Sequence, residues 1–129
     1  MYEFKAEYVT GIESVDEEHR RLFEIADEAY ELMQEEFLVD KYDQVTQILS
    51  ELKEYALTHF EHEEAYMESI NYKHMFIQKV QHDQFREKIN NLDLDHLDEN
   101  TEDVLEDILS FVTDWLVSHI LEHDKQIGR

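Results

Sequence analysis

Apolar residues recur at intervals of three and four along four long stretches of the chain, a pattern typical of helices that bury one face. The first stretch begins at Ser14, and Glu17 three residues later completes the pattern of a capping box at a helix N-terminus. Its apolar members are Leu22, Phe23, Ile25, Ala26, Ala29, Leu32 and Met33. The spacing therefore predicts a first helix that starts at about residue 14.

Three further helices are predicted from the same spacing. The second runs over about 40–70 and ends before a turn at Asn71, and the third covers about 72–89. The apolar members of the third are Phe76, Ile77, Val80, Phe85 and Ile89. A polar connection over 91–101 precedes the last helix, which Gly128 ends. Four long helices with short connections predict an all-α, antiparallel up-down-up-down four-helix bundle.

The composition agrees with long helices in one folded unit. The chain has no proline and two glycines, both near its ends, so that the predicted helices are not interrupted. Because 42% of its 129 residues are hydrophobic, we expect a single domain over 1–129, with residues 1–13 as an N-terminal arm. We expect Phe4 and Tyr8 to pack this arm across one end of the bundle.

The strongly negative net charge of the chain argues against some classes of binding partner. A formal net charge of -22 repels nucleic acid and anionic membrane surfaces, both of which need basic patches on a protein that binds them. The absence of cysteine excludes disulfides, thiolate metal ligands and cysteine nucleophiles. The sequence shows neither a signal peptide nor a membrane span, so we expect a cytoplasmic protein without nucleic acid or membrane partners.

Histidines and carboxylates form a candidate metal site. His19, His59, His82 and His119 fall one on each predicted helix, and inward faces of antiparallel helices can converge at one level of a bundle. His59 and Glu63 are four residues apart, one turn apart on the same helical face. A lone histidine on an apolar stripe is more often a core residue, but this set indicates a transition-metal site. The candidate ligands are His19, His59, Glu63, His82, His119 and Asp124.

Several short motifs give the chain a resemblance to the bacterial hemerythrins, and the likeness runs from about Tyr8 to Ile127. These motifs are Val9-Thr10-Gly11-Ile12, Val15-Asp16-Glu17-Glu18-His19, His59-Phe60-Glu61-His62-Glu63-Glu64 with Met67, His82 followed by Phe85, and Trp115-Leu116-Val117-Ser118-His119-Ile120 with Asp124. Their order and spacing make the resemblance specific. It implies the same four-helix bundle fold that the periodicity predicts.

The resemblance also implies a cofactor and a ligand set. The cofactor would be two iron ions with an oxo or hydroxo bridge, and dioxygen would bind reversibly as a ligand. One iron would take His19 and His59 and keep an open position, and the other would take His82, His119 and a third nitrogen. Two carboxylates would bridge the ions, and an apolar pocket would surround the dioxygen. The bridges would be Glu63 and Asp124, and the pocket residues would be Phe60, Trp115 and Ile120.

Gln78 departs from the family pattern, which has a histidine four residues before His82. The glutamine is a candidate ligand through its amide oxygen, a hydrogen-bond donor to a coordinated water, or a side chain that points away. Each alternative leaves one iron poorer in nitrogen donors, which favours a second exchangeable position or a different divalent metal. His74 is no substitute, because eight residues span about 12 Å along a helix axis.

The last helix presents a conflict of spacing. An ideal helix places His123, four residues after His119, on the same face, whereas Asp124 is rotated by about 140° from His119. The resemblance favours Asp124, because a bridge between two cations needs a carboxylate. A local widening of the helix would bring Asp124 to the site.

Residues around the motifs have plainer interpretations. His62 and Glu64 flank the candidate ligands on other faces of the helix, so we expect them to be solvated or to support the ligands. His96 lies in the acidic connection and is expected to be exposed.

Three functions follow from these observations. The first is reversible binding of dioxygen by an oxygen carrier, scavenger or sensor. The alternative is a di-iron enzyme that turns over peroxide or reduces oxygen, made possible by Gln78 in place of a histidine. The third is a metal-binding or storage module. An electron-donor protein is a candidate partner for the first two functions.

Overall fold

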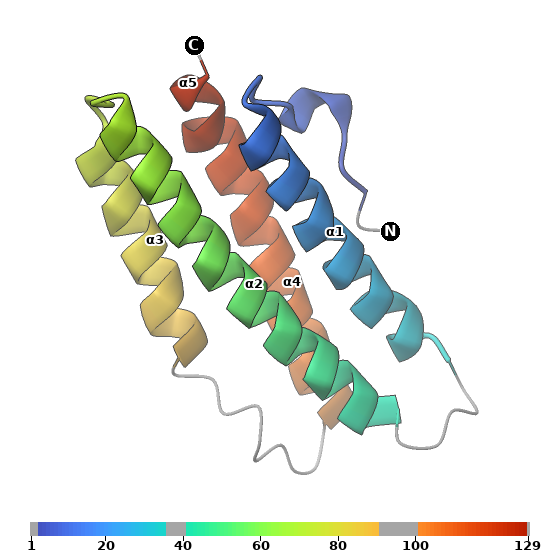
Figure 1. Ribbon diagram of the computed structural model, residues 1–129. Helices are drawn as coiled ribbons and strands as arrows, with labels where there is room; N and C mark the ends of the chain where they lie inside the picture. The colour runs from blue at the N-terminus through green and yellow to red at the C-terminus, as the bar shows by residue number, and fades with distance from the viewer. Residues whose placement is uncertain (1–2, 36–40, 91–100, 129) are drawn as a thin grey trace.

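The computed structural model describes residues 3–35, 41–90 and 101–128. The elements in chain order are η1 (Ala6–Tyr8), α1 (Glu13–Met33), α2 (Lys41–Ser69), α3 (Met75–Asn90), α4 (Thr101–His119), the π-helical segment η2 (Ile120–Asp124) and α5 (Lys125–Ile127). Figure 1 shows the four long helices packed side by side, each antiparallel to the next along the chain. The prediction of an all-α four-helix bundle is therefore confirmed. No helix in these ranges has both the length and the apolar character to cross a membrane.

The start of α1 differs from the prediction. The helix begins at Glu13, and Ser14 does not cap it, because Ile12 occupies the N-cap position without a side-chain cap bond. The carboxylate of Asp16 organises the entry instead, since it accepts bonds from the backbone N–H and hydroxyl of Thr10, both at 2.8 Å. The polar groups that precede the helix are thus satisfied by a buried aspartate in its first turn.

The turn between α2 and α3 explains why α3 begins at Met75 and not at residue 72. Asn71 adopts a left-handed backbone conformation with φ of 52°. The N–H of Tyr72 donates to the carbonyl of Met67 at 2.9 Å, and that of Asn71 donates to Glu68 at 3.1 Å. These bonds form a Schellman motif, which ends α2 and delays the next helix by several residues.

One face of α3 also differs from the predicted pattern. Phe85 and Ile89 are buried, but Phe76 is 78% exposed and Ile77 is 49% exposed, and Val80 is exposed too. The inward positions at that end of the helix are taken by polar side chains. The buried residues of α3 are Gln78, His82, Phe85 and Ile89, spaced four, three and four apart. The polar members displace the apolar ones to the surface.

The N-terminal arm packs as the sequence predicts. Tyr8 is buried and stacks on Phe23 of α1, with ring centroids 5.4 Å apart. Ile120 of η2 joins the same cluster, and Phe4 covers it from outside. The arm therefore seals the bundle against α1 and η2, at the end where α5 and the α2–α3 turn also lie (Figure 1).

Candidate metal centre

Each helix of the bundle contributes a polar side chain to one buried cluster. His19 comes from α1, His59 and Glu63 from α2, and His82 from α3, while His119 and Asp124 come from the end of α4 and from η2. All six side chains are buried, together with Gln78 of α3. The structure thus brings together every residue that the sequence marks as a candidate ligand.

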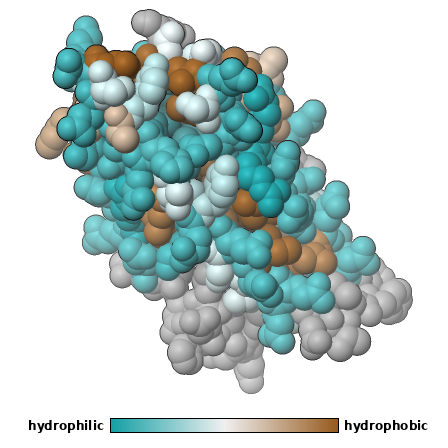
Figure 2. All heavy atoms as spheres, in the orientation of Figure 1, coloured by the Kyte–Doolittle hydropathy of each residue, from teal (hydrophilic) through white to brown (hydrophobic). Residues whose placement is uncertain are grey.

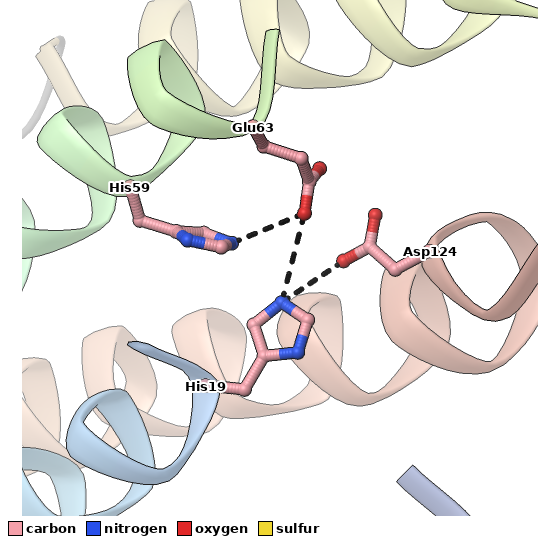
Figure 3. Close-up of side chains that lie close together, drawn as sticks. All are labelled: His19, His59, Glu63 and Asp124. Carbon is pink, nitrogen blue, oxygen red and sulfur yellow. Dashed lines mark ion pairs between the residues drawn. The ribbon is translucent and has the colours of Figure 1, made fainter. Parts of the chain in front are cut away.

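The first group of potential ligands contains His19, His59, Glu63 and Asp124 (Figure 3). The Nε2 atom of His19 lies 3.1 Å from Oδ2 of Asp124 and 3.8 Å from Oε2 of Glu63. The Nε2 atom of His59 lies 3.3 Å from the same Glu63 oxygen. Two imidazole nitrogens and two carboxylate oxygens therefore face one small volume, which is a donor set for a transition metal.

The second group contains Glu63, His82, His119 and Asp124. The Nε2 atom of His82 lies 3.1 Å from Oε1 of Glu63. The Nε2 atom of His119 lies 3.1 Å from Oδ1 of Asp124 and also 3.1 Å from Nε2 of His82. In each group, the potential ligand atoms lie within 4.8 Å of one another.

The two carboxylates belong to both groups and divide their oxygens between them. Oε2 of Glu63 faces His19 and His59, and Oε1 faces His82. Oδ2 of Asp124 faces His19, and Oδ1 faces His119. A carboxylate that offers one oxygen to each of two neighbouring volumes has the geometry of a bridge. The arrangement therefore suits two cations rather than one.

The π-helical segment places Asp124 at the site. His119 is the last residue of α4, and the wider turn Ile120–Asp124 follows it directly. The side chain of Asp124 then reaches His119 five residues before it, and His123 is only partly buried beside the cluster. The expected local widening of the helix is confirmed. Such segments occur frequently at functional sites, because they shift side chains out of the ordinary register.

Two further carboxylates orient the imidazoles. Glu18 bonds Nδ1 of His59 at 2.7 Å, and Glu64 bonds Nδ1 of His82 at 2.7 Å. With the proton on Nδ1, each ring presents the lone pair of Nε2 to the site, as metal-binding histidines require. Sequence reasoning missed the role of Glu18, because its partner His59 is 41 residues away on another helix. The only sequence signal is its place directly before His19.

The side chains next to these carboxylates complete the support. His62 bonds the second oxygen of Glu18 at 2.6 Å, and Arg86 donates to Glu64 at 3.0 Å. His62 and Glu64 therefore support the ligands, one of the two roles that the sequence left open. His74 is exposed and outside the cluster, as expected. His96 lies outside the described residues.

Gln78 points into the cluster. Its Nε2 atom donates to Oδ1 of Asp124 at 3.1 Å, and its Oε1 atom is buried without a hydrogen-bond partner among the described residues. The alternative that this side chain turns away from the site is therefore wrong. An unpaired buried oxygen beside a bridging carboxylate fits a cation, or a water bound to one, in the second group.

Charge balance gives a second test of whether a metal fits these residues. Burial by itself lowers the pKa of His59, but its hydrogen bond to Glu18 and the adjacent carboxylate of Glu63 raise that pKa to about 10. Burial lowers the pKa of His119 as well, yet Asp124 and Glu63 raise it to about 9. In the metal-free protein, the neighbouring carboxylates thus favour the protonated forms of His59 and His119. Metal cations would supply the same positive charge, so the donor set fits them.

Two of the three predicted pocket residues contact the cluster, and the third lies in the apolar group under the N-terminal arm. Phe60 stacks on the ring of His82 at 4.1 Å, and Trp115 stacks on the ring of His119 at 4.5 Å. Ile120 is fully buried next to Tyr8. Apolar groups therefore cover the imidazoles, while a direct role of these three residues in binding a ligand stays a prediction.

Comparison with known proteins gives one consistent result. Residues 10–129 match the family model described as the hemerythrin HHE cation binding domain. A bacteriohemerythrin of Clostridium acetobutylicum is 44% identical over 126 residues, which cover 98% of both chains. A bacteriohemerythrin of Methylococcus capsulatus is 27% identical over 95% of this chain and 90% of its own length. One of Pseudomonas aeruginosa is 26% identical over 89% of this chain and 71% of its own length.

Proposed function

Because the chain belongs to the hemerythrin family, we propose that it is a non-haem di-iron protein that binds dioxygen reversibly. The observation that carries this proposal is the pair of overlapping ligand groups that share Glu63 and Asp124. A single-ion site would need neither the divided carboxylate oxygens nor four histidines. Similarity to two bacteriohemerythrins over most of their length supports the same proposal.

The residues of the cluster have distinct roles in this proposal. His19 and His59 would hold one iron, and His82 and His119 would hold the other, with both carboxylates shared. When bound, the iron pair supplies the electrons and the open coordination position with which dioxygen is taken up and released. Four protein donors in the first group leave room for such a position.

The surrounding residues would keep the site ordered and dry. Glu18 and Glu64 hold two imidazoles in the orientation that binding needs. Phe60 and Trp115 cover the rings of His82 and His119, so that water is excluded from one side of the cluster. Exclusion of water would slow the loss of dioxygen as superoxide, which carries away one electron and would leave the iron pair oxidised by one electron.

The test of this function begins with elemental analysis of the purified protein. Two iron atoms per chain are expected, whereas zinc or calcium in variable amounts would favour a storage or general metal-binding module. The reduced iron-loaded protein should then develop colour in air and bleach when oxygen is removed, over several cycles. Irreversible oxidation within the first cycle would contradict reversible binding.

A second candidate function is favoured by Gln78. Its amide nitrogen donates to Asp124, and its unpaired oxygen would take the place of an imidazole donor in the second group. A weaker neutral ligand leaves a second exchangeable position, which suits the turnover of hydrogen peroxide with a reductant. We propose that Gln78 shifts the protein toward this activity, with oxygen binding still the principal function.

Substitution of Gln78 separates the two functions. Gln78→His restores the family pattern, so peroxide turnover should fall and the number of reversible oxygen cycles should rise. If neither quantity changes, Gln78 does not set the balance between binding and turnover. Glu68→Gln, an exposed change near the end of α2, provides the control.

A further inference from the structure

An apolar surface lies on the outer side of α3, on the opposite side of the helix from the metal centre. Phe76 is 78% exposed, and Ile77 and Val80 are exposed beside it. Positions 77 and 80 are three residues apart and positions 76 and 80 are four apart, so these three share one face of α3, and Lys73 lies in the turn just before the helix. We define the α3 surface as Ile70, Lys73, Phe76, Ile77, Lys79 and Val80. Figure 2 shows apolar patches reaching the surface among hydrophilic residues at this end of the bundle.

The charge of the α3 surface is opposite to that of the protein. The chain has 33 acidic residues and a formal net charge of -22, yet no acidic residue occurs between 69 and 82. Lys73 and Lys79 lie in this stretch, and neither forms an ion pair with another residue that the structure describes. By contrast, Arg21 and Arg86 are paired with carboxylates. The α3 surface is therefore a locally basic and apolar area on an acidic protein.

The inner side of the same helix carries two residues of the metal centre. Gln78 and His82 are buried in the cluster, whereas their neighbours Ile77 and Lys79 belong to the α3 surface. A helix with its side chains is about 10–12 Å across, so a bound partner would lie about one helix thickness from the ligands. A hollow of about 500 Å³ adjoins this surface, with Ile70, Lys73 and Ile127 in its lining.

We propose that the α3 surface docks an acidic one-electron carrier protein, which reduces the iron pair after it has become oxidised. This inference rests on the proposed di-iron function, because a protein without a redox metal needs no such partner. Each encounter would transfer one electron from the reduced carrier to the iron pair. Two encounters would leave two carriers oxidised by one electron each and the iron pair reduced by two.

Physical reasons favour this occupant over others. An exposed aromatic residue in an apolar centre is a typical anchor of a protein interface, and complementary charge at the rim accelerates association. Nucleic acid and anionic membranes carry negative charge over an extended area, which the net charge of -22 repels well beyond the α3 surface. A second copy bound through the same surface would place its own Lys73 and Lys79 against those of the first, so that like charges would meet. A small acidic carrier can instead present its carboxylates to the two lysines alone.

The test measures the rate of reduction of the oxidised, iron-loaded protein by stopped-flow absorbance. The electron donor is a reduced, acidic [2Fe–2S] ferredoxin at low ionic strength, and dithionite serves as a small donor that needs no docking surface. Phe76→Ser and the double variant Lys73→Glu with Lys79→Glu should each lower the rate with ferredoxin at least tenfold. The double variant should also lose most of the decrease in rate that added salt causes in the parent protein.

Matched controls distinguish docking from a general effect. Tyr42→Ser removes an exposed aromatic ring at the other end of α2, and Lys41→Glu with Lys53→Glu makes the same change of charge. Both controls should stay within twofold of the parent, and dithionite should reduce all variants equally. Equal rate losses in controls and test variants would overturn the proposal, as would no loss in the test variants.

Two other outcomes also decide against the proposal. A dimer in sedimentation that Phe76→Ser dissociates would show that a second copy occupies the surface. Failure of dithionite to reduce the loaded parent protein would contradict the di-iron function, and the docking proposal with it. If dithionite reduces the protein and oxygen binding is reversible, a negative ferredoxin result removes the docking proposal alone.

Discussion

The two ends of the bundle bury different chemistry in the same fold. The end that carries the arm and the α2–α3 turn buries imidazoles, carboxylates and Gln78. The other end is filled with aliphatic and aromatic side chains. Its buried members include Ala29, Met33, Val45, Leu49, Leu52, Ile89, Leu105, Ile108 and Leu109. The same four helices thus carry the candidate metal ligands at one end of the bundle and the apolar core that stabilises the fold at the other.

The contrast has an energetic meaning. Apolar burial stabilises the fold by about 25 cal/mol for each Å² removed from water. Burial of charged groups carries a desolvation cost, which is offset only when partners and cations are well placed. Four buried polar atoms at the metal end, on His19, Glu63, Gln78 and His119, have no hydrogen-bond partner within the described residues. The apolar end therefore supplies the stability of the fold, and the polar cluster at the other end is suited to binding metal.

The largest expected effect is a loss of metal when a bridging carboxylate is changed. Asp124→Asn removes the charge that faces both groups, so the iron content should fall from two atoms per chain to one or none. His123→Gln is the control, because ideal helical spacing would choose that residue as the ligand. If His123→Gln loses the metal and Asp124→Asn keeps it, the π-helical register is not what sets the ligand.

A truncated core side chain at the apolar end should lower the stability of the fold and leave the metal content unchanged. Leu52 is fully buried in the apolar cluster, so Leu52→Ala should lower the free energy of unfolding by about 2–5 kcal/mol. The folded variant should still bind two iron atoms. Urea unfolding and elemental analysis measure the two quantities, with exposed Glu51→Ala expected within about 0.5 kcal/mol of the parent. Metal loss in folded Leu52→Ala would show that the two ends are not independent.

Removal of an orienting carboxylate should weaken metal binding without abolishing it. Glu18→Gln and Glu64→Gln each replace a strong partner of a ligand imidazole, so metal affinity should fall about 10- to 100-fold. A competition titration against a chelator measures this change. Glu61 is exposed on α2, the helix that also carries Glu64. Glu61→Gln should therefore leave the metal affinity unchanged. An equal effect in all three variants would assign the loss to net charge.

The smallest effect concerns the pH dependence of the metal-free protein. The pKa of His59 is raised to about 10 and that of His119 to about 9 in the fold, compared with 6.5 for an ordinary histidine. Their protonated forms therefore stabilise the metal-free fold fully below about pH 6.5, and this contribution is lost as the pH rises to 9–10. Glu63 acts in the opposite sense, since its pKa is lowered although burial opposes this, and its contribution is lost in acid.

Urea midpoints at several pH values measure this dependence. The midpoint of the metal-free protein should decrease from pH 6.5 to pH 10, whereas bound metal replaces the protons and should flatten the curve. A metal-free midpoint that increases over this range would contradict the assignment of protons to the cluster.

The sequence alone determined the helices, their approximate limits and the identity of the clustered residues. Apolar periodicity acts over three or four residues, so four helices could be read directly from it. The conflict between His123 and Asp124 was visible in the spacing, and a local widening of the helix was the correct solution. The Ser14 cap was wrong, because a buried Asp16 competed for the same entry turn.

Only the tertiary structure decided which atoms face one another. Glu18 and His59 meet across 41 residues, Gln78 and Asp124 meet across 46, and the outward turn of Phe76 depends on which neighbours fill the inner face of α3. The division of each bridging carboxylate between two groups is likewise a product of four helices converging at one level. Helical spacing fixes the face of a side chain, but contacts between helices depend on packing over distances that no local pattern records.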